Sequence, residues 1–175
     1  MTYYRTRTYI AGDWDGDREA INQLYKWGKS DQWDLSFPDA HELTQARDDS
    51  LNCNIKRSLA TRLNASKTFV LVVGDNTINL RSGSCQYCDS KNTWTGACSR
   101  GYNTDDRSYI EFECEKADKD GLKIVVLYNN TYVDRNKCPE SLRWKGTHVA
   151  MVLCYLLGYI PYWNYNAVRE ALQMQ

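Results

Sequence analysis

Three glutamates on one predicted helix are the first candidates for chemistry in this chain. The segment 108–128 reads as a short helix, a glycine stop and a buried strand. On a helical wheel with about 100° per residue, Glu111 and Glu115 fall on one flank of the apolar stripe, and Glu113 falls on the other, beside Tyr109. We therefore expect Glu111 and Glu115 to be solvated and Glu113 to lie at the edge of the core. A carboxylate there can be partly desolvated and directed into a cleft, although an ordinary boundary glutamate gives the same pattern.

A second set of acidic residues follows two predicted strands. Asp13 and Asp15 come after the first strand, and Asp75 comes after the third. Carboxylates gathered at one edge of a parallel sheet would suit Mg²⁺ and phosphoryl chemistry of the response-regulator receiver type, because Mg²⁺ takes hard oxygen ligands. A receiver also needs a lysine just after its last strand, and none follows the segment HVAMVLC. The alternative is that these aspartates, together with Asp17, are turn and capping residues.

The cysteines and histidines give weaker patterns. Cys85 and Cys88 form a Cys-x-x-Cys pair, and Cys98 follows after nine intervening residues, which resembles half of a zinc site. A reversible disulfide within the loop and plain free thiols are the other interpretations, and free thiols are the default for seven scattered cysteines in a reducing compartment. His41 follows the second predicted strand, where a ligand loop is expected. We expect no prosthetic group, with zinc as a weak alternative.

Composition excludes several classes of protein. The formal net charge is zero, from 22 basic and 22 acidic residues, which argues against a general nucleic-acid binder. No apolar run approaches the roughly 18 residues of a membrane span, and the N-terminus shows no signal-peptide core. We therefore expect a cytoplasmic protein that binds neither nucleic acid nor membranes. The motifs GxGxxG, GxxxxGK[ST] and GxSxG are absent, which disfavours a Rossmann dehydrogenase, a P-loop NTPase and an α/β-hydrolase.

Alternating strand and helix patterns predict the fold class. Strands are expected at 7–12, 33–38, 68–75, 122–128 and 148–154. Helices are expected at 18–29, at 51–63, from a cap near Asp105 or Asp106 to Gly121, at 139–143 and at 165–172. The strands at 68–75 and 122–128 are apolar on both faces, as central parallel strands are. We predict one α/β domain over residues 1–175, with five parallel strands in flavodoxin-like order, helices on both faces and a long cysteine-containing loop at about 76–104. Lys56, Arg57 and Arg62 are expected on the exposed face of the second helix.

The segment around Glu113 resembles the third helix of TIR domains. The likeness consists of a serine, a nearby aromatic residue, Glu-x-x-x-Ala, a glycine and an apolar strand. These elements stand here as Ser108, Tyr109, Phe112, Glu113, Ala117, Gly121 and LKIVVLY. The segments KTFVLVVGDNT, YIAGDWDGD and FPDAH extend the resemblance to the TIR-like proteins of the Thoeris antiphage defence system, B component, over about residues 5–130. The chain departs from that pattern in its cysteine-rich loop at 80–104, and in Tyr109 and Phe112 where many members have tryptophan.

The resemblance implies an activity and a set of partners. TIR enzymes cleave the bond between nicotinamide and ribose in NAD and require the glutamate, so Glu113 would be catalytic and NAD the substrate. The positions implied to contact the substrate are Asp13, Trp14, His41, Asp75, Asn76, Thr77 and Tyr109. An ADP-ribose-derived messenger, expected to be cyclic, would activate a separate effector protein after a phage-derived trigger, and TIR-like contacts would allow self-association. The alternatives are a non-catalytic TIR-like interaction module and a receiver-like phosphoryl switch.

Overall fold

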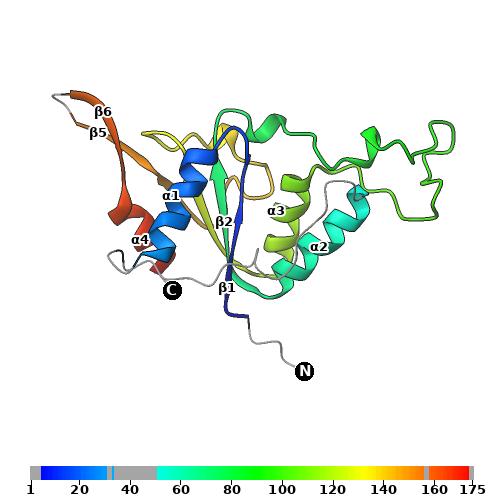
Figure 1. The fold of residues 1–175 in the computed structure, drawn as a ribbon, viewed down its shortest axis with the longest axis horizontal. Coiled ribbons are helices and arrows are strands. Elements are labelled where there is room, and N and C mark those ends of the chain that lie inside the picture. Colours follow the sequence, from blue (N-terminus) through cyan, green and yellow to red (C-terminus); the bar gives the residue numbers. More distant parts are fainter. Residues whose placement is uncertain (1–4, 31–32, 34–50, 156–157, 174–175) are drawn as a thin grey trace.

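Four parallel strands form the main sheet, in the order β1–β2–β3–β4 (Figure 1). The computed structural model describes residues 5–30, 33, 51–155 and 158–173. The strands are β1 (Arg7–Ala11), β2 (Ser66–Val73), β3 (Lys123–Tyr128) and β4 (Thr147–Ala150). Val70 at the centre of β2 pairs with Ile10 on one side and Val125 on the other. Among the described strands, this order corresponds to strands 1, 3, 4 and 5 of the flavodoxin-like arrangement. The segment 33–38 was predicted as the remaining strand, and apart from Trp33 it lies outside the described residues.

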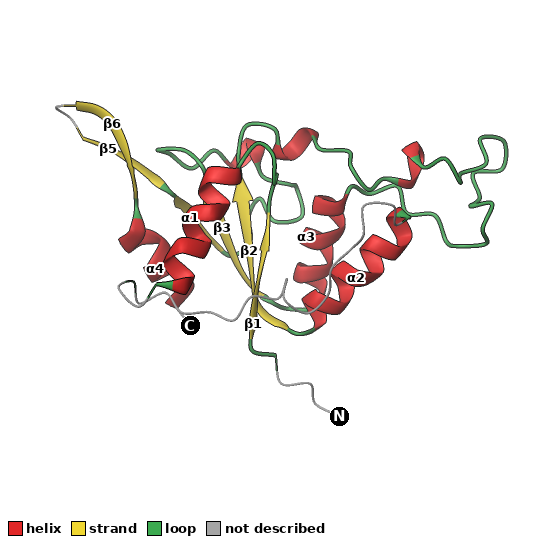
Figure 2. Cartoon of the chain, in the orientation of Figure 1, coloured by secondary structure: helices red, strands yellow, loops and turns green. Residues whose placement is uncertain are grey.

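Helices cover both faces of this sheet (Figure 2). They are α1 (Arg18–Lys29), α2 (Asn52–Asn64), α3 (Tyr109–Lys119) and α4 (Tyr165–Gln173). Side chains of β2 alternate between the faces, so Val70 and Val72 pack with α1 and α4, whereas Phe69 and Leu71 pack with α2 and α3. The predicted α/β class with doubly apolar strands is confirmed. Among the described residues, none of the helices has the length and apolar character needed to cross a membrane.

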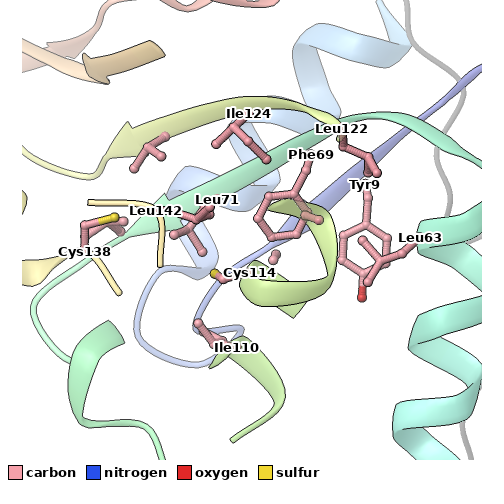
Figure 3. Close-up of a cluster of buried hydrophobic side chains, with 14 of the residues drawn as sticks. Tyr9, Leu63, Phe69, Leu71, Ile110, Cys114, Leu122, Ile124, Cys138 and Leu142 are labelled. Carbon is pink, nitrogen blue, oxygen red and sulfur yellow. The ribbon is translucent and has the colours of Figure 1, made fainter. Parts of the chain in front are cut away.

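The start of α3 is fixed by a reciprocal cap at Ser108, and not at Asp105 or Asp106 as predicted. The Ser108 hydroxyl accepts from the backbone N–H of Glu111 at 3.2 Å, and the Glu111 carboxylate accepts from the backbone N–H of Ser108 at 2.7 Å. From there the helix turns Ile110 and Cys114 into the cluster against β2 (Figure 3). The capping box therefore sets which residues of α3 face the core.

The second helix contradicts one sequence prediction. Lys56 and Arg62 were expected to be exposed, but both are buried, and of the three predicted basic residues only Arg57 is exposed. The Lys56 ammonium donates to the backbone carbonyls of Asp105 and Arg107 at 2.9 and 2.6 Å. An apolar stripe with a period of four cannot reveal this, because the partners come from a loop about 50 residues further along the chain.

The predicted loop at 76–104 leaves the sheet after β2 and projects beyond α2 and α3 (Figure 1). It contains two single-turn 3₁₀ helices, η2 (Thr77–Asn79) and η3 (Cys85–Tyr87), and an antiparallel bridge between Lys91 and Cys98. The Asn92 carboxamide accepts from the backbone N–H groups of Trp94 and Thr95, at 2.8 and 3.1 Å. The loop thus carries its own small structure, as expected for a connection of that length.

The C-terminal third departs from two predictions. The predicted strand at 148–154 is divided, because β4 ends at Ala150, where its partner β3 also ends. The chain then forms an antiparallel hairpin, β5 (Val152–Tyr155) with β6 (Gly158–Trp163), which projects from the sheet (Figure 1). The predicted helix at 139–143 is a series of turns, and a short 3₁₀ helix, η4 (Arg135–Lys137), forms just before it. The Asp134 carboxylate starts η4 by accepting from the backbone N–H of Asn136 at 3.1 Å.

Candidate functional site

Glu113 lies on the inner face of α3, where β1, α2 and α3 meet. Its side chain is 7% exposed. The hydroxyl of Tyr9, in the middle of β1, donates a hydrogen bond to Oε1 of Glu113. Arg62 of α2 is also close enough to act electrostatically on both groups. A buried carboxylate, a buried hydroxyl and a buried guanidinium from three separate elements therefore form one polar cluster inside an otherwise apolar core.

Burial controls the protonation of this cluster. It raises the pKa of Glu113 to about 7, against the opposing effects of the Tyr9 hydrogen bond and the Arg62 charge. Burial and the neighbouring Glu113 carboxylate raise the pKa of Tyr9 well above its usual value, so the phenol remains a hydrogen-bond donor. A carboxyl group that titrates near neutral pH in a buried position is typical of functional sites in enzymes.

The three glutamates of α3 have separate environments. Glu113 points further into the core than its helical-wheel position predicts. Glu111 is half-buried, and its carboxylate caps the helix, so the prediction that it is solvated is wrong. Glu115 is exposed, as predicted, and pairs with Arg107 at 2.7 Å.

The carboxyl edge of the sheet holds a second polar cluster. The Asp17 carboxylate is buried and accepts from the Asn129 carboxamide at 2.9 Å. It lies against the backbone of Gly74, where a Cβ would overlap its oxygens. Burial raises the pKa of Asp17, and the charges of Asp13 and Asp75 act in the same direction, whereas the Asn129 hydrogen bond lowers it. Asp17 therefore joins the ends of three strands, and it makes no side-chain capping bond to α1.

Asp13 and Trp14 lie in the turn after β1. The Asp13 carboxylate accepts from the backbone N–H of Asp15 at 3.1 Å, which is a turn-forming bond. The Trp14 indole is 45% exposed and lies 6.1 Å from the ring of Tyr25, measured between ring centroids. Both residues are at the edge where open α/β sheets bind ligands.

The three predicted residues after β2 differ in exposure. The Asp75 side chain is 83% exposed and pairs with Lys137 at 2.5 Å. Asn76 is exposed and begins η2. Thr77 is buried, and its hydroxyl accepts from the backbone N–H of Gly74 at 2.9 Å.

Tyr109 anchors the long loop to the helices. Its ring lies against Gly83, where a Cβ would overlap the ring, and its hydroxyl donates to the Asn52 carboxamide oxygen at 2.9 Å. Burial raises the pKa of Tyr109 to about 12, with smaller effects from Cys85, Cys88 and Cys53.

The metal and histidine predictions gain no support from this geometry. Within the described ranges, no three His, Cys, Asp or Glu side chains are arranged to hold a metal ion, which leaves the zinc alternative at Cys85, Cys88 and Cys98 without geometric support. The same holds for a magnesium site built from Asp13, Asp15 and Asp75. His41 lies outside the described residues.

A cavity of about 320 Å³ opens beside the N-terminus of α3. Its polar lining comes from the loop after β2, from α3 and from the segment after β3. These polar residues include Thr77, Arg81, Ser108, Glu111, Glu115 and Arg143. Of the predicted site residues that the structure describes, only Thr77 lines this cavity, and Glu113 does not. The predicted residues therefore do not form one site. Glu113 lies in the core, Tyr109 holds the long loop, and the described others lie at the carboxyl edge.

A comparison with family models bears on this arrangement. Residues 3–82 match the model described as Thoeris protein ThsB, TIR-like domain. This part of the chain is similar to the TIR-like domain of Thoeris protein ThsB. The match includes β1 with Tyr9 and α2 with Arg62, and it ends before α3, so it does not extend to Glu113. No curated protein matches the chain.

Two members of the Glu113 cluster, Tyr9 and Arg62, were not predicted from the sequence. Tyr9 sits in the strand RTYIA, where an aromatic residue is ordinary, and its hydroxyl gives no pattern of its own. Arg62 lies immediately before Leu63, the last residue of the apolar stripe of α2, and from its position in the sequence it resembles a surface residue. The available signal was the placement of β1 beside β2, because it brings the first strand close to the helix that follows β2.

Proposed function

We propose that this protein cleaves NAD at the nicotinamide–ribose bond, with Glu113 as the catalytic residue. Its product would be an ADP-ribose-derived, cyclic messenger that acts in the cytoplasm on a separate effector of antiviral defence. The observation that carries the proposal is the buried Glu113 carboxylate, whose pKa is near neutral and whose Oε1 is held by Tyr9 on a TIR-like sheet. The ThsB family match supports the choice of reaction class.

The chemistry follows from the charge of Glu113. In the ionised state it stabilises the positive charge that develops on the ribose as the C–N bond breaks, as carboxylates do in glycosidases. The bonding electron pair leaves with the ring nitrogen, so cationic pyridinium becomes neutral nicotinamide. Water, or a nucleophile within ADP-ribose itself, then attacks the anomeric carbon and loses a proton. A low-dielectric site strengthens the electrostatic effect of the carboxylate.

The residues at the carboxyl edge supply groups that would bind the rest of NAD. Trp14 presents a half-exposed indole, suited to stacking on a flat ring. Asn76 and Asp75 are exposed polar residues on the next loop, and Thr77 lines the neighbouring cavity. We propose that these residues contact the ribose and phosphate groups, and that self-association and a phage-derived trigger bring the protein into its active state.

A non-catalytic interaction module is the second candidate function. One observation favours it: the Glu113 carboxylate is buried, is bound by Tyr9 and does not line the 320 Å³ cavity. In that case Glu113 would serve packing, and the protein would act through contacts between TIR-like domains. This candidate predicts no turnover of NAD in any assembly state.

Nicotinamide release distinguishes the two candidates. Purified protein is incubated with NAD, with and without a lysate of phage-infected cells as a source of the trigger, and nicotinamide is measured by chromatography. The proposal predicts release that rises with the lysate and is lost in Glu113→Gln. Undiminished release by that variant would overturn the site assignment. Protection of cells from phage by Glu113→Gln, without nicotinamide release, would establish the interaction module instead.

A further inference from the structure

Tyr9 has an unusual position for a residue that touches a catalytic carboxylate. It is 0% exposed, it lies in the middle of β1, and its ring stacks on Phe69 with centroids 5.8 Å apart. Its hydroxyl reaches Oε1 of Glu113 across 104 positions of the sequence. Tyr9 is fully buried whereas Glu113 is 7% exposed, so a contact of this pair with a substrate would be made by Glu113.

We infer that Tyr9 is the positioning residue of Glu113, holding Oε1 so that Oε2 is presented to the ribose of the substrate. This inference rests on the proposed function, because it assigns Tyr9 a role in that same reaction. A glutamate side chain on a helix has several rotamers. The hydrogen bond from Tyr9 to Oε1 restricts Glu113 to one of them before the substrate binds. At metal sites, groups that orient a ligating side chain change activity by about 10- to 100-fold when they are removed, and we expect an effect of this size for Tyr9.

Among the described residues, the charged and titratable groups near the Glu113 carboxylate come from three elements. On β1 the neighbour is Tyr9, on α2 it is Arg62, and on α3 it is the buried thiol of Cys114. Tyr9 and Arg62 both favour the ionised form of Glu113, against burial. Loss of the Tyr9 hydroxyl must therefore raise the pH at which Glu113 ionises, as well as loosen its geometry. The titration of Glu113 reports the Tyr9 contact, and kcat with the acid limb of the rate profile reports whether that contact serves the reaction.

Tyr9→Phe tests the inference, and Tyr128→Phe is the matched control. Tyr128 is also buried and lies on the parallel strand β3 in the same hydrophobic cluster. Its substitution by phenylalanine removes a hydroxyl that is hydrogen-bonded to His148 at 2.9 Å. Each protein is assayed with NAD across pH 5–9 for kcat and KM. The Glu113 carboxyl is also titrated by ¹³C NMR in the absence of NAD.

The expected result for Tyr9→Phe is a kcat about 10- to 100-fold lower, with KM within about threefold. The acid limb of the rate profile and the NMR midpoint should both move upward by about one pH unit, while Tyr128→Phe leaves them at the wild-type position. If Tyr9→Phe does not fold, 3-fluorotyrosine at position 9 provides a stronger donor of nearly the same shape, and both midpoints should move downward.

Failure of the positioning role and failure of the proposed function give different results. An active wild-type protein whose kcat and Glu113 midpoint are unchanged in Tyr9→Phe, or with 3-fluorotyrosine at position 9, would overturn the positioning role and leave the proposed function intact. A wild-type protein that releases no nicotinamide, with or without the lysate, would overturn the proposed function, and the positioning role of Tyr9 in that reaction would fall with it. In that second case a shifted NMR midpoint would show only a structural contact.

Discussion

Glu113 and Glu115 lie two residues apart on α3 and have opposite environments. Glu113 is buried and accepts from Tyr9 on β1, whereas the Glu115 side chain is 50% exposed and pairs with Arg107 at 2.7 Å. The helix is the same and the side chains are identical, so the difference arises from the direction in which each side chain leaves the helix. This pair provides a test residue and its control within one turn.

The first prediction concerns stability and pH. Burial raises the pKa of Glu113 in the folded protein to about 7, from about 4.5 in the unfolded chain. Its contribution to stability is therefore full below about pH 4.5 and is lost as pH rises through 7. Glu113→Gln avoids burying a charge and keeps an oxygen for the Tyr9 hydroxyl. Between pH 5 and pH 8 this variant should therefore gain roughly 2 to 4 kcal/mol relative to wild type in urea unfolding.

Glu115→Gln is the control for that measurement. It removes an ion pair with a half-exposed carboxylate, which is worth at most about 1 kcal/mol. Its difference from wild type should stay nearly constant between the two pH values. A Glu113→Gln variant that behaves in the same way would contradict the burial of a titrating carboxyl group in this core.

The second prediction concerns Lys56, which closes the long loop onto α2. Its ammonium donates to the carbonyls of Asp105 and Arg107 and lies 3.4 Å from the Asp105 carboxylate. Lys56→Met would leave these half-buried acceptors without their buried donor and should cost about 2 to 4 kcal/mol. Protease cleavage within residues 88–104 should also become faster. Lys119→Met, at an exposed position near the end of α3, should change neither measurement appreciably.

The third prediction compares two glycines of the same loop. Gly83 and Gly96 both have positive φ, at 89° and 68°, so alanine strains the backbone at both. At Gly83 a Cβ would also overlap the ring of Tyr109, whereas nothing lies within 4 Å at Gly96. In thermal unfolding, Gly83→Ala should therefore destabilise the protein by about 1 to 3 kcal/mol more than Gly96→Ala does. Equal effects would show that Tyr109 does not pack on Gly83 in solution.

The fourth prediction concerns the carboxyl edge, where Asp17 lies against Gly74. Gly74→Ala should displace the buried carboxylate from its Asn129 partner and cost about 2 to 4 kcal/mol. In an Asp17→Ala background the same substitution should cost less than about 1 kcal/mol, because its steric partner is gone. The double-mutant cycle isolates this contact, and additive costs would contradict it.

The parts of the fold predicted from sequence were those with strong local signals. The helix at 18–29 and the strands around Val70 and Val125 have a clear period or a continuous apolar run. The division of the strand predicted at 148–154 could not be read locally, because it depends on where β3 ends. The same applies to Lys56, whose partners come from a distant loop.

The candidate site shows the same division. Glu113 stood out from sequence because its wheel position differs from those of Glu111 and Glu115. Its depth in the core and its bond to Tyr9 depend on the packing of β1 against α3, which no local pattern encodes. Glu111 was misjudged for a related reason, since the capping box that holds it depends on where the helix begins.

The most direct test of the central claim is nicotinamide release from NAD by wild type, Glu113→Gln and Glu115→Gln. The three proteins are compared at pH 8, at equal folded concentration and in the presence of the lysate. The account predicts that Glu113→Gln loses at least about 100-fold in rate, while Glu115→Gln stays within about threefold of wild type. Equal loss in both variants, or none in Glu113→Gln, would contradict a catalytic role for the buried carboxylate.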